Sequence, residues 1–219
     1  TDSKACRQGR YGIMTAKRKA EKEGTSMNHS GTKRLETKRL ILRRFTEDDA
    51  PAMYKNWASD GEVTKFLTWQ PYKSLEDAEK TLAVWVRDYE RKDCYQWAIV
   101  LKGEEGCAGE PIGSISAVKY DDSISMVQVG YCLGKQWWHQ GIMTEALSCV
   151  MDYFFDTVGA NRIEALHDVN NPHSGQVMKK CGMRYEGTMR QAGRNNQGLS
   201  DLCCYGALAE DRMSKNRDR

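Results

Sequence analysis

The sequence predicts a mixed α/β (α+β) fold built on a largely antiparallel sheet. Short apolar runs separated by Gly-, Asp- and Ser-rich linkers fill residues 95–133, a pattern typical of an antiparallel meander. Two segments with capped starts and helical spacing precede that meander, over residues 46–89. A strand–helix–strand step over residues 125–169 then predicts one parallel strand pair with a crossover helix.

The first half of this fold is predicted as one strand followed by two helices. The strand covers residues 40–45. Thr46 precedes three acidic residues and Ser74 precedes two, and hydroxyl caps and early acids both stabilise a helix start. The second helix has apolar residues at helical spacing: Ala78, Leu82, Trp85, Val86 and Tyr89. The aromatic segment 66–72 between the helices either packs under a loop or walls a substrate pocket.

The second half adds three meander strands, two helices and three further strands. The predicted strands are 95–101, 111–120, 125–133, 163–169, 185–191 and 199–208. A helix with a single apolar face begins at Gly141 and ends at Gly159. A second helix begins at Asn171 with proline in its first turn and ends at Gly182.

Composition and cysteine usage limit the function classes. The eight cysteines form no C-x-x-C pair, and most lie in apolar segments: Cys6, Cys94, Cys107, Cys132, Cys149, Cys181, Cys203 and Cys204. We interpret them as reduced thiols, which indicates a cytoplasmic protein. We expect no metal site, because the arrangement of Cys181, His167 and His173 matches no standard zinc spacing. No apolar run is long enough to span a membrane, so we expect no membrane-spanning helix.

Positive charge is concentrated at the beginning of the chain. Residues 1–39 carry 11 basic and 4 acidic residues, whereas the rest carries 22 basic and 26 acidic residues. Residues 1–33 are therefore predicted to be a basic, flexible extension, partly upstream sequence, and residues 213–219 a charged tail. Nucleic-acid binding by the folded body is only weakly supported, although the basic arm could grip RNA or a ribosome.

Two predicted helix starts have the chemistry of an anion site. The first follows a strand that ends at Leu133 and a loop that leads to Gly141, and the second begins at Asn171. The first turn of a helix has N–H groups without intrahelical partners, which together with the helix dipole can bind a diphosphate. If the strands before them are parallel neighbours, both starts lie at the same edge of the sheet, where α/β folds bind ligands.

Five segments match, in order, the motifs of one known family. They are Leu35–Arg43 (LETxRLxLR), Gly130–Leu133 (GYxL), Trp138–Ala146 (WxxGxxTEA), Asn171–Met183 (NxxSxxVxxKxGM) and Tyr185–Gln191 (YEGTxRQ). Over about 35–210 the chain resembles the GCN5-related N-acetyltransferases (GNAT), in the RimJ/RimL-like branch that acetylates N-termini of ribosomal proteins. The resemblance implies an acetyltransferase domain over 34–212. It also implies a six- to seven-stranded sheet with helices on both faces and a V-shaped splay between two parallel strands.

The resemblance also implies the cofactor and its contacts. Acetyl-CoA would be the acetyl donor, without a metal. Its diphosphate would lie on the amides of a loop, and its pantetheine arm beside the splayed strand. The implied cofactor-binding residues are Tyr131, Cys132, Leu133, His139, Gln140, Gly141, Ile142, Met143, Thr144, Asn171 and Lys180. Ser174 would lie near the sulfur and is the candidate proton donor to the leaving thiolate, with a plain helix-cap role as the alternative.

Departures from the family pattern leave the general base and the acceptor open. Gln128 stands where many relatives have a Glu, and Met178 where many have a Tyr acid. The expected acceptor is a primary amine, either on a protein N-terminus of the ribosomal-protein type or on a small molecule such as a polyamine, aminoglycoside or amino acid. A protein that only binds acetyl-CoA is a further alternative, and a homodimer is possible. Candidate substrate residues are Trp69, Tyr72 and Glu186.

Overall fold

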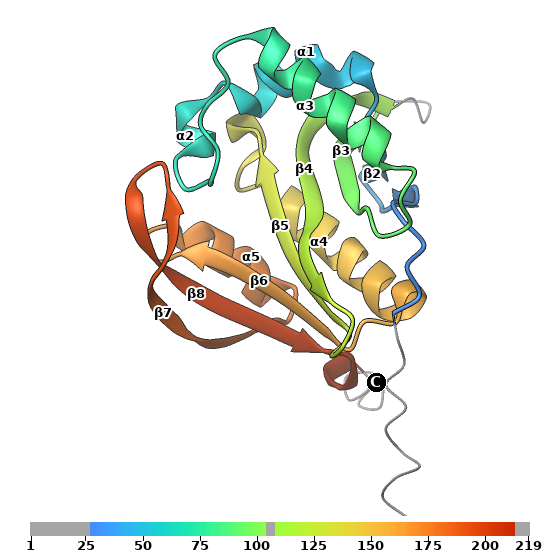
Figure 1. Cartoon of the computed structure of the whole chain (residues 1–219), viewed down its shortest axis with the longest axis vertical. Helices are drawn as coiled ribbons and strands as arrows, with labels where there is room; N and C mark the ends of the chain where they lie inside the picture. Colours follow the sequence, from blue (N-terminus) through green and yellow to red (C-terminus); the bar gives the residue numbers. More distant parts are fainter. Residues whose placement is uncertain (1–26, 104–107, 213–219) are drawn as a thin grey trace, which may run out of the picture.

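The structure is a computed structural model that describes residues 27–103 and 108–212. The predictions for residues 1–26 and 213–219 lie outside the described residues. The described chain forms one mixed sheet with helices packed on it (Figure 1).

The sheet has eight strands within the described residues, in the order β1-β2-β3-β4-β5-β6-β8-β7. Their bounds are β1 Leu35–Glu36, β2 Leu40–Arg43, β3 Gln96–Lys102, β4 Ala108–Asp121, β5 Met126–Leu133, β6 Arg162–Asp168, β7 Arg184–Asn195 and β8 Gly198–Leu208. The antiparallel meander and the parallel β5–β6 pair confirm the predicted fold class. The sheet exceeds the expected six to seven strands because the two residues of β1 pair with β2.

The parallel strands β5 and β6 separate partway along their length. Their registered pairs run from Met126 opposite Arg162 to Val129 opposite Ala165. Beyond that point β5 continues to Leu133, while β6 continues to Asp168 and pairs along its other edge with β8. The two strands therefore diverge as a V, as expected, and this opening is visible between β5 and β6 in Figure 1.

Helical segments cover both faces of the sheet. The α-helices are α1 Ala50–Met53, α2 Gly61–Thr64, α3 Leu75–Asp88, α4 Ile142–Tyr153 and α5 Pro172–Lys180. Leu40 and Leu42 of β2 face the core shared with α4, whereas Ile41 between them faces the core under α1 and α3. This alternation is the period of a strand buried on both sides, so helices on both faces are confirmed.

Two predicted helices contain irregular turns. The segment after Thr46 is a 3-10 turn, then α1, then a π-helical turn over Tyr54–Ala58. The long predicted helix is α4 followed by a π-helical turn over Phe154–Val158, and Gly159 ends it with a left-handed φ of 77°. None of the helices in the described ranges is long and apolar enough to cross a membrane.

The predicted boundary of the N-terminal extension at residue 33 needs a correction. Met27 is only 5% exposed and belongs to the main core. Asn28 donates its backbone N–H to the carbonyl of Val158 at 2.8 Å, and the Thr32 hydroxyl donates to the carbonyl of Cys94 at 2.9 Å. Residues 27–33 are therefore part of the folded domain, because burial and hydrogen bonds hold them to it.

Candidate active site

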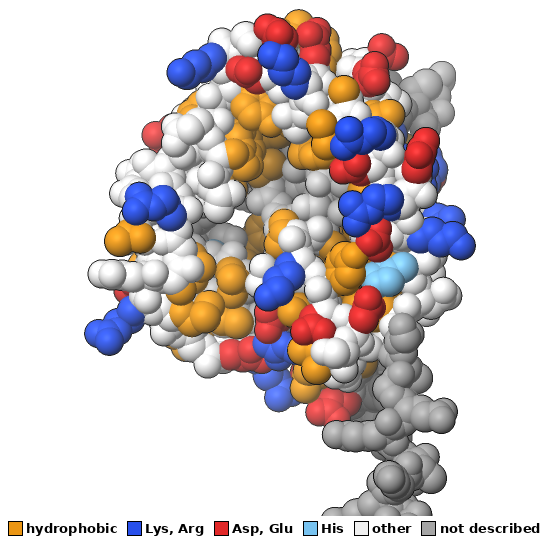
Figure 2. All heavy atoms as spheres, in the orientation of Figure 1, with side chains coloured by type: hydrophobic (Ala, Val, Ile, Leu, Met, Phe, Trp, Pro, Cys, Tyr) orange, Lys and Arg blue, Asp and Glu red, His pale blue; other side chains and the backbone are white. Residues whose placement is uncertain are grey.

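A cleft of about 550 Å³ opens where β5 and β6 diverge. Its walls come from the end of β5, the loop and first turn of α4, the first turns of α5, and α2 with the loop after it. Figure 2 shows the molecule hollowed on this face, between the region of α2 and β5 and the region of α5 and β6. Eleven predicted site residues line the cleft: Tyr131, Cys132, Leu133, His139, Gly141, Ile142, Met143, Thr144, Asn171, Ser174 and Lys180.

The loop before α4 forms a cradle of backbone amides. Gly141 is the N-cap of α4 and has a left-handed φ of 74°, and His139 also has a positive φ, of 61°. Only glycine adopts the left-handed region without a steric cost, which explains Gly141 at this position. The N–H groups of the first turn of α4 have no intrahelical acceptors and point outward as anion donors. The cradle therefore suits a diphosphate.

The two helix starts meet at one edge of the sheet, as predicted. The imidazole rings of His139, before α4, and His173, in the first turn of α5, have centroids 4.8 Å apart in an edge-on contact. Both residues line the cleft. An extended ligand in this cleft would therefore touch both helix starts at once.

The side chain of Tyr131 connects β5 to the first turn of α5. Its phenol oxygen lies 3.0 Å from Ser174 Oγ and donates to the Ser174 carbonyl at 3.1 Å. Burial raises the pKa of Tyr131, while the hydrogen bond with Ser174 opposes that shift. The phenol is therefore protonated at neutral pH, and a proton can be shared along the pair of hydroxyls.

Cys132 lies on the other side of β5 from Tyr131. Its sulfur is 3.3 Å from Ser114 Oγ, and burial raises the pKa of the thiol. The thiol is thus protonated at neutral pH and unsuited to act as a nucleophile. Because successive residues of a strand face opposite sides, β5 presents Tyr131 to one core and Cys132 to the other.

Trp69 and Tyr72 lie outside the set of described residues that line the cleft. Their rings have centroids 5.2 Å apart, and the Tyr72 hydroxyl is 2.7 Å from that of Thr81 on α3. Both pack against the core that includes Cys132. They lie on the side of β5 that Cys132 faces.

Gln140 and Glu186 are also predicted site residues outside the cleft lining. Gln140 sits in the cradle loop, but its amide donates to the carbonyl of Gln136 at 2.9 Å. Glu186 accepts from Arg162 at 2.8 Å, and this contact lowers the pKa of its carboxyl group. Glu186 is therefore an ion-pair partner on β7, and the structure does not bring it to the cleft.

Several lining residues were not predicted. Glu62, Val63 and Lys65 belong to α2 or its end, and Phe66 and Leu67 follow. Phe66 and Leu67 belong to the aromatic segment for which a pocket wall was one of two interpretations. Helix α2 itself has four residues and no apolar stripe, so no sequence signal identified it.

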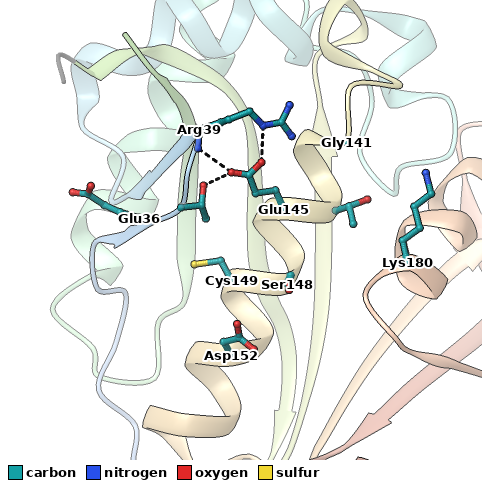
Figure 3. A pocket seen from close by; sticks show the side chains of 10 residues that line it. Glu36, Arg39, Gly141, Glu145, Ser148, Cys149, Asp152 and Lys180 are labelled. Carbon is teal, nitrogen blue, oxygen red and sulfur yellow. Dashed lines mark hydrogen bonds and ion pairs between the residues drawn. The ribbon is translucent and has the colours of Figure 1, made fainter. Parts of the chain in front are cut away.

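A second groove, of about 570 Å³, adjoins the cleft on the outer side of α4 (Figure 3). Gly141, Thr144 and Lys180 line both hollows, so the two are continuous around the start of α4. Lys180 projects from α5 toward this groove and supplies a positive charge beside the cradle. Among the residues that the structure describes, no group of three or more potential metal ligands occurs.

A splayed parallel strand pair with an amide cradle at its mouth suits an extended ligand that carries a diphosphate, such as coenzyme A. Residues 39–184 match the sequence profile described as "Acetyltransferase (GNAT) domain". The chain belongs to the GNAT family of N-acetyltransferases, and its acetyl donor is acetyl-CoA.

Individual relatives agree with this assignment. The chain is 31% identical to the uncharacterized N-acetyltransferase YoaA of Bacillus subtilis, over 72% of this chain and 86% of that protein. It is 26% identical to a ribosomal-protein-serine acetyltransferase of Escherichia coli, over 78% and 93% of the two chains. The structure of RimL, a ribosomal L7/L12 α-N-protein acetyltransferase in complex with coenzyme A, aligns with a TM-score of 0.69, 22% identity and coverage of 80% and 98%.

Proposed function

We propose that this N-acetyltransferase acetylates the α-amine of a protein N-terminus. The observation that carries the proposal is the scarcity of carboxylate bases in the cleft. Among the described residues that line it, Glu62 is the one carboxylate, and it is exposed on α2. The two histidines of the lining, His139 and His173, contact each other at the helix starts, beside the amide cradle. An α-amine has a pKa near ~8 and is partly neutral at physiological pH, whereas a lysine amine near ~10.4 needs a base. A site whose one carboxylate is exposed, and whose histidines lie beside the cradle, thus favours the α-amine.

On the side of the cleft that α2 lines, the β7–β8 turn is hydrogen-bonded to α2 and to the loop after it. The Asn196 side-chain amide donates to the carbonyls of Thr64 at 2.9 Å and Trp69 at 2.8 Å, and Gln70 also bonds to Asn196. This bridge links the red hairpin to the loop after α2 in Figure 1. An entrance bounded by this contact suits a narrow substrate such as the terminus of a polypeptide. Relatives of this chain that act on ribosomal proteins also support a protein acceptor.

The residues of the cleft fit acetyl-CoA, which supplies an activated thioester when it is bound. The amides from His139 to Thr144 would hold the diphosphate, and Lys180 would hold negative charge beside them. The backbone of β5 from Tyr131 to Leu133, together with Asn171, would orient the pantetheine arm. Positioning of this kind supplies much of the rate enhancement when a neutral amine attacks directly.

Ser174 would act as proton donor to the leaving thiolate. As the amine nitrogen forms its bond to the acetyl carbon, a backbone N–H near Cys132 would stabilise the oxyanion. The carbon–sulfur bond would then break, and the proton of Ser174 Oγ would go to the sulfur. The Tyr131 phenol, 3.0 Å from Ser174 Oγ, would turn from the Ser174 carbonyl to donate to the serine oxygen. The amine nitrogen would lose one proton to solvent, and one proton from solvent would restore the Ser174 hydroxyl, so the protons balance.

The test uses matched acceptors at one concentration of acetyl-CoA. Peptides with a free N-terminus and no lysine are compared with N-blocked peptides that contain one lysine, and with spermidine, an aminoglycoside and free amino acids. The proposal predicts thiol release, and a mass increase at the N-terminus, for the free-N-terminus peptides. Turnover restricted to small amines, or to the blocked peptides, would contradict it.

A further inference from the structure

The turn between β1 and β2 is bonded to the first turn of α4. The Glu145 carboxylate accepts from Thr37 Oγ1 at 2.5 Å, from the backbone N–H of Arg39 at 3.0 Å, and from Arg39 Nε at 2.7 Å. These bonds join residues more than 100 positions apart in the sequence, and Figure 3 shows them converging on Glu145. We call Thr37, Arg39 and Glu145 the clamp.

The clamp holds the amide cradle on both sides. Glu145 follows the cradle on α4, and its N–H donates to the Gly141 carbonyl at 3.1 Å. Arg39 Nη1 donates to the carbonyl of Gln140, immediately before Gly141, at 3.0 Å. A single guanidinium group thus fixes the cradle loop and the helix turn after it.

The β1–β2 turn is itself rigidly supported. Thr37 Oγ1 accepts from the N–H of Leu40 at 2.9 Å, and the Thr37 carbonyl accepts from Lys102 Nζ at 2.7 Å. Leu40 is fully buried in the main core. The clamp therefore ties the cradle to the core of the sheet.

The charges of the clamp also matter for an anionic ligand. Burial acts to raise the pKa of Glu145, but hydrogen bonds from Thr37 and Arg39 outweigh burial, and the net pKa is lowered. The carboxylate is ionised, and an unpaired negative charge at this place would repel a diphosphate. Arg39 neutralises it, so the N–H groups of the cradle act on the ligand unopposed.

We infer that Thr37 and Arg39 are positioning residues for the diphosphate of the acetyl donor, acting through Glu145 and Gln140. Neither residue needs to touch the ligand for this role. The inference rests on the donor site described above and is independent of which amine is acetylated. The expected effect of breaking the clamp is weaker binding of ligands that carry the diphosphate, with little change for ligands that lack it.

The test compares Thr37→Val and Arg39→Gln with Arg34→Gln as the matched control. Arg34 is exposed and pairs with Glu36 in the same hairpin, so its loss removes a charge without touching the clamp. Binding of coenzyme A and of pantetheine, which has no diphosphate, is measured by calorimetry. Both clamp variants should bind coenzyme A about tenfold more weakly, the magnitude of one lost charge-assisted hydrogen bond. Their pantetheine affinity should change by less than about twofold, and Arg34→Gln should match the wild type.

Hydrogen exchange of the ligand-free protein gives a second readout. Amides of residues 139–145 should exchange faster in Thr37→Val than in the control, and Thr37→Ser should restore both exchange and affinity. Wild-type affinity in Thr37→Val would overturn the inference, and so would a loss confined to Arg39→Gln, which would mean that Arg39 contacts the phosphate directly. If Thr37→Val does not fold, Thr37→Ala, which also removes the hydroxyl, replaces it with the same expectations. Failure of the wild type to bind coenzyme A would instead refute the donor site.

Discussion

The paired hydroxyls of Tyr131 and Ser174 lie in the opening between β5 and β6, where the proposed proton transfer takes place. Their oxygens are 3.0 Å apart, and burial keeps the phenol protonated. Ser174 was the predicted proton donor from its motif, whereas its partnership with Tyr131 depends on residues 43 positions apart. The sequence could indicate the serine but not the tyrosine that supports it.

Replacing Ser174 with alanine should lower kcat about 100-fold with little change in the KM for acetyl-CoA, because only the proton donor is lost. Tyr131→Phe should lower kcat less, since Ser174 keeps its own proton. Initial rates over a range of acetyl-CoA concentrations measure both effects. Ser123→Ala, in the turn at the far end of β5, is the control. An unchanged kcat in Ser174→Ala would leave Ser174 with only the role of a helix-cap residue.

Asp93 should make stability sensitive to acid. Hydrogen bonds from Arg91 and Tyr120 lower its pKa from 3.8 to about 2. Because the folded-state pKa is the lower one, its stabilising contribution is complete above about pH 4 and is lost as the pH falls toward 2. Asp93→Asn should therefore reduce the free energy of unfolding at pH 7 by about 1 kcal/mol or less, since the group is partly exposed.

Urea unfolding at pH 7, 4, 3 and 2 checks this expectation. The difference between the wild type and Asp93→Asn should shrink as the pH falls from 4 to 2. Asp122→Asn, nearby and more exposed, provides the comparison. A difference that stays constant over this range would contradict the assigned cause.

At the scale of elements, the β7–β8 hairpin is joined to the loop after α2 through Asn196. Asn196→Ala should raise the KM for a peptide acceptor several-fold, because two charge-neutral hydrogen bonds that shape the entrance are lost. Affinity for coenzyme A should not change. Gln197→Ala, at the adjacent exposed position, is the matched control, and equal effects of the two substitutions would count against the bridge.

Elements whose signals are local were predicted well. Pro172 in the first turn of α5 and Gly141 at the start of α4 fixed both helix starts, because caps depend only on neighbouring residues. Helix α2 was missed because four residues carry no periodicity. A substrate role for Glu186 stays a prediction. In the structure Glu186 pairs with Arg162, a contact that the sequence could not indicate because strand register, with its bulge after Tyr185, decides what the side chain of a strand residue meets.

At the scale of the whole molecule, two cores lie on opposite faces of one sheet. The clamp, the cradle and the main core all share α4, so the cofactor site depends on the packing of that helix. The parallel pair and its crossover could be predicted from the order of elements. The packing of residues 27–33 against the core could not be predicted, because it depends on single long-range hydrogen bonds such as that from Asn28 to Val158.

Leu147→Ala should therefore destabilise the whole domain. Leu147 is fully buried on α4, and removing a large aliphatic side chain from a core costs about 2–5 kcal/mol. Ser148→Ala, exposed on the same helix, should change the free energy of unfolding by less than about 0.5 kcal/mol. Equilibrium urea unfolding measures both, and a small loss in Leu147→Ala would mean that the core around α4 is loosely packed.

The central claim is that acetyl-CoA lies in the opening between β5 and β6, with its sulfur at Ser174. The most direct measurement is a crystal structure of the protein with coenzyme A. The account predicts diphosphate oxygens about 3 Å from the amides at the start of α4. It also predicts the sulfur within hydrogen-bond reach of Ser174 Oγ, at a distance comparable to the 3.3 Å between Cys132 Sγ and Ser114 Oγ. Coenzyme A bound away from the β5–β6 opening, or a sulfur out of reach of Ser174, would contradict it.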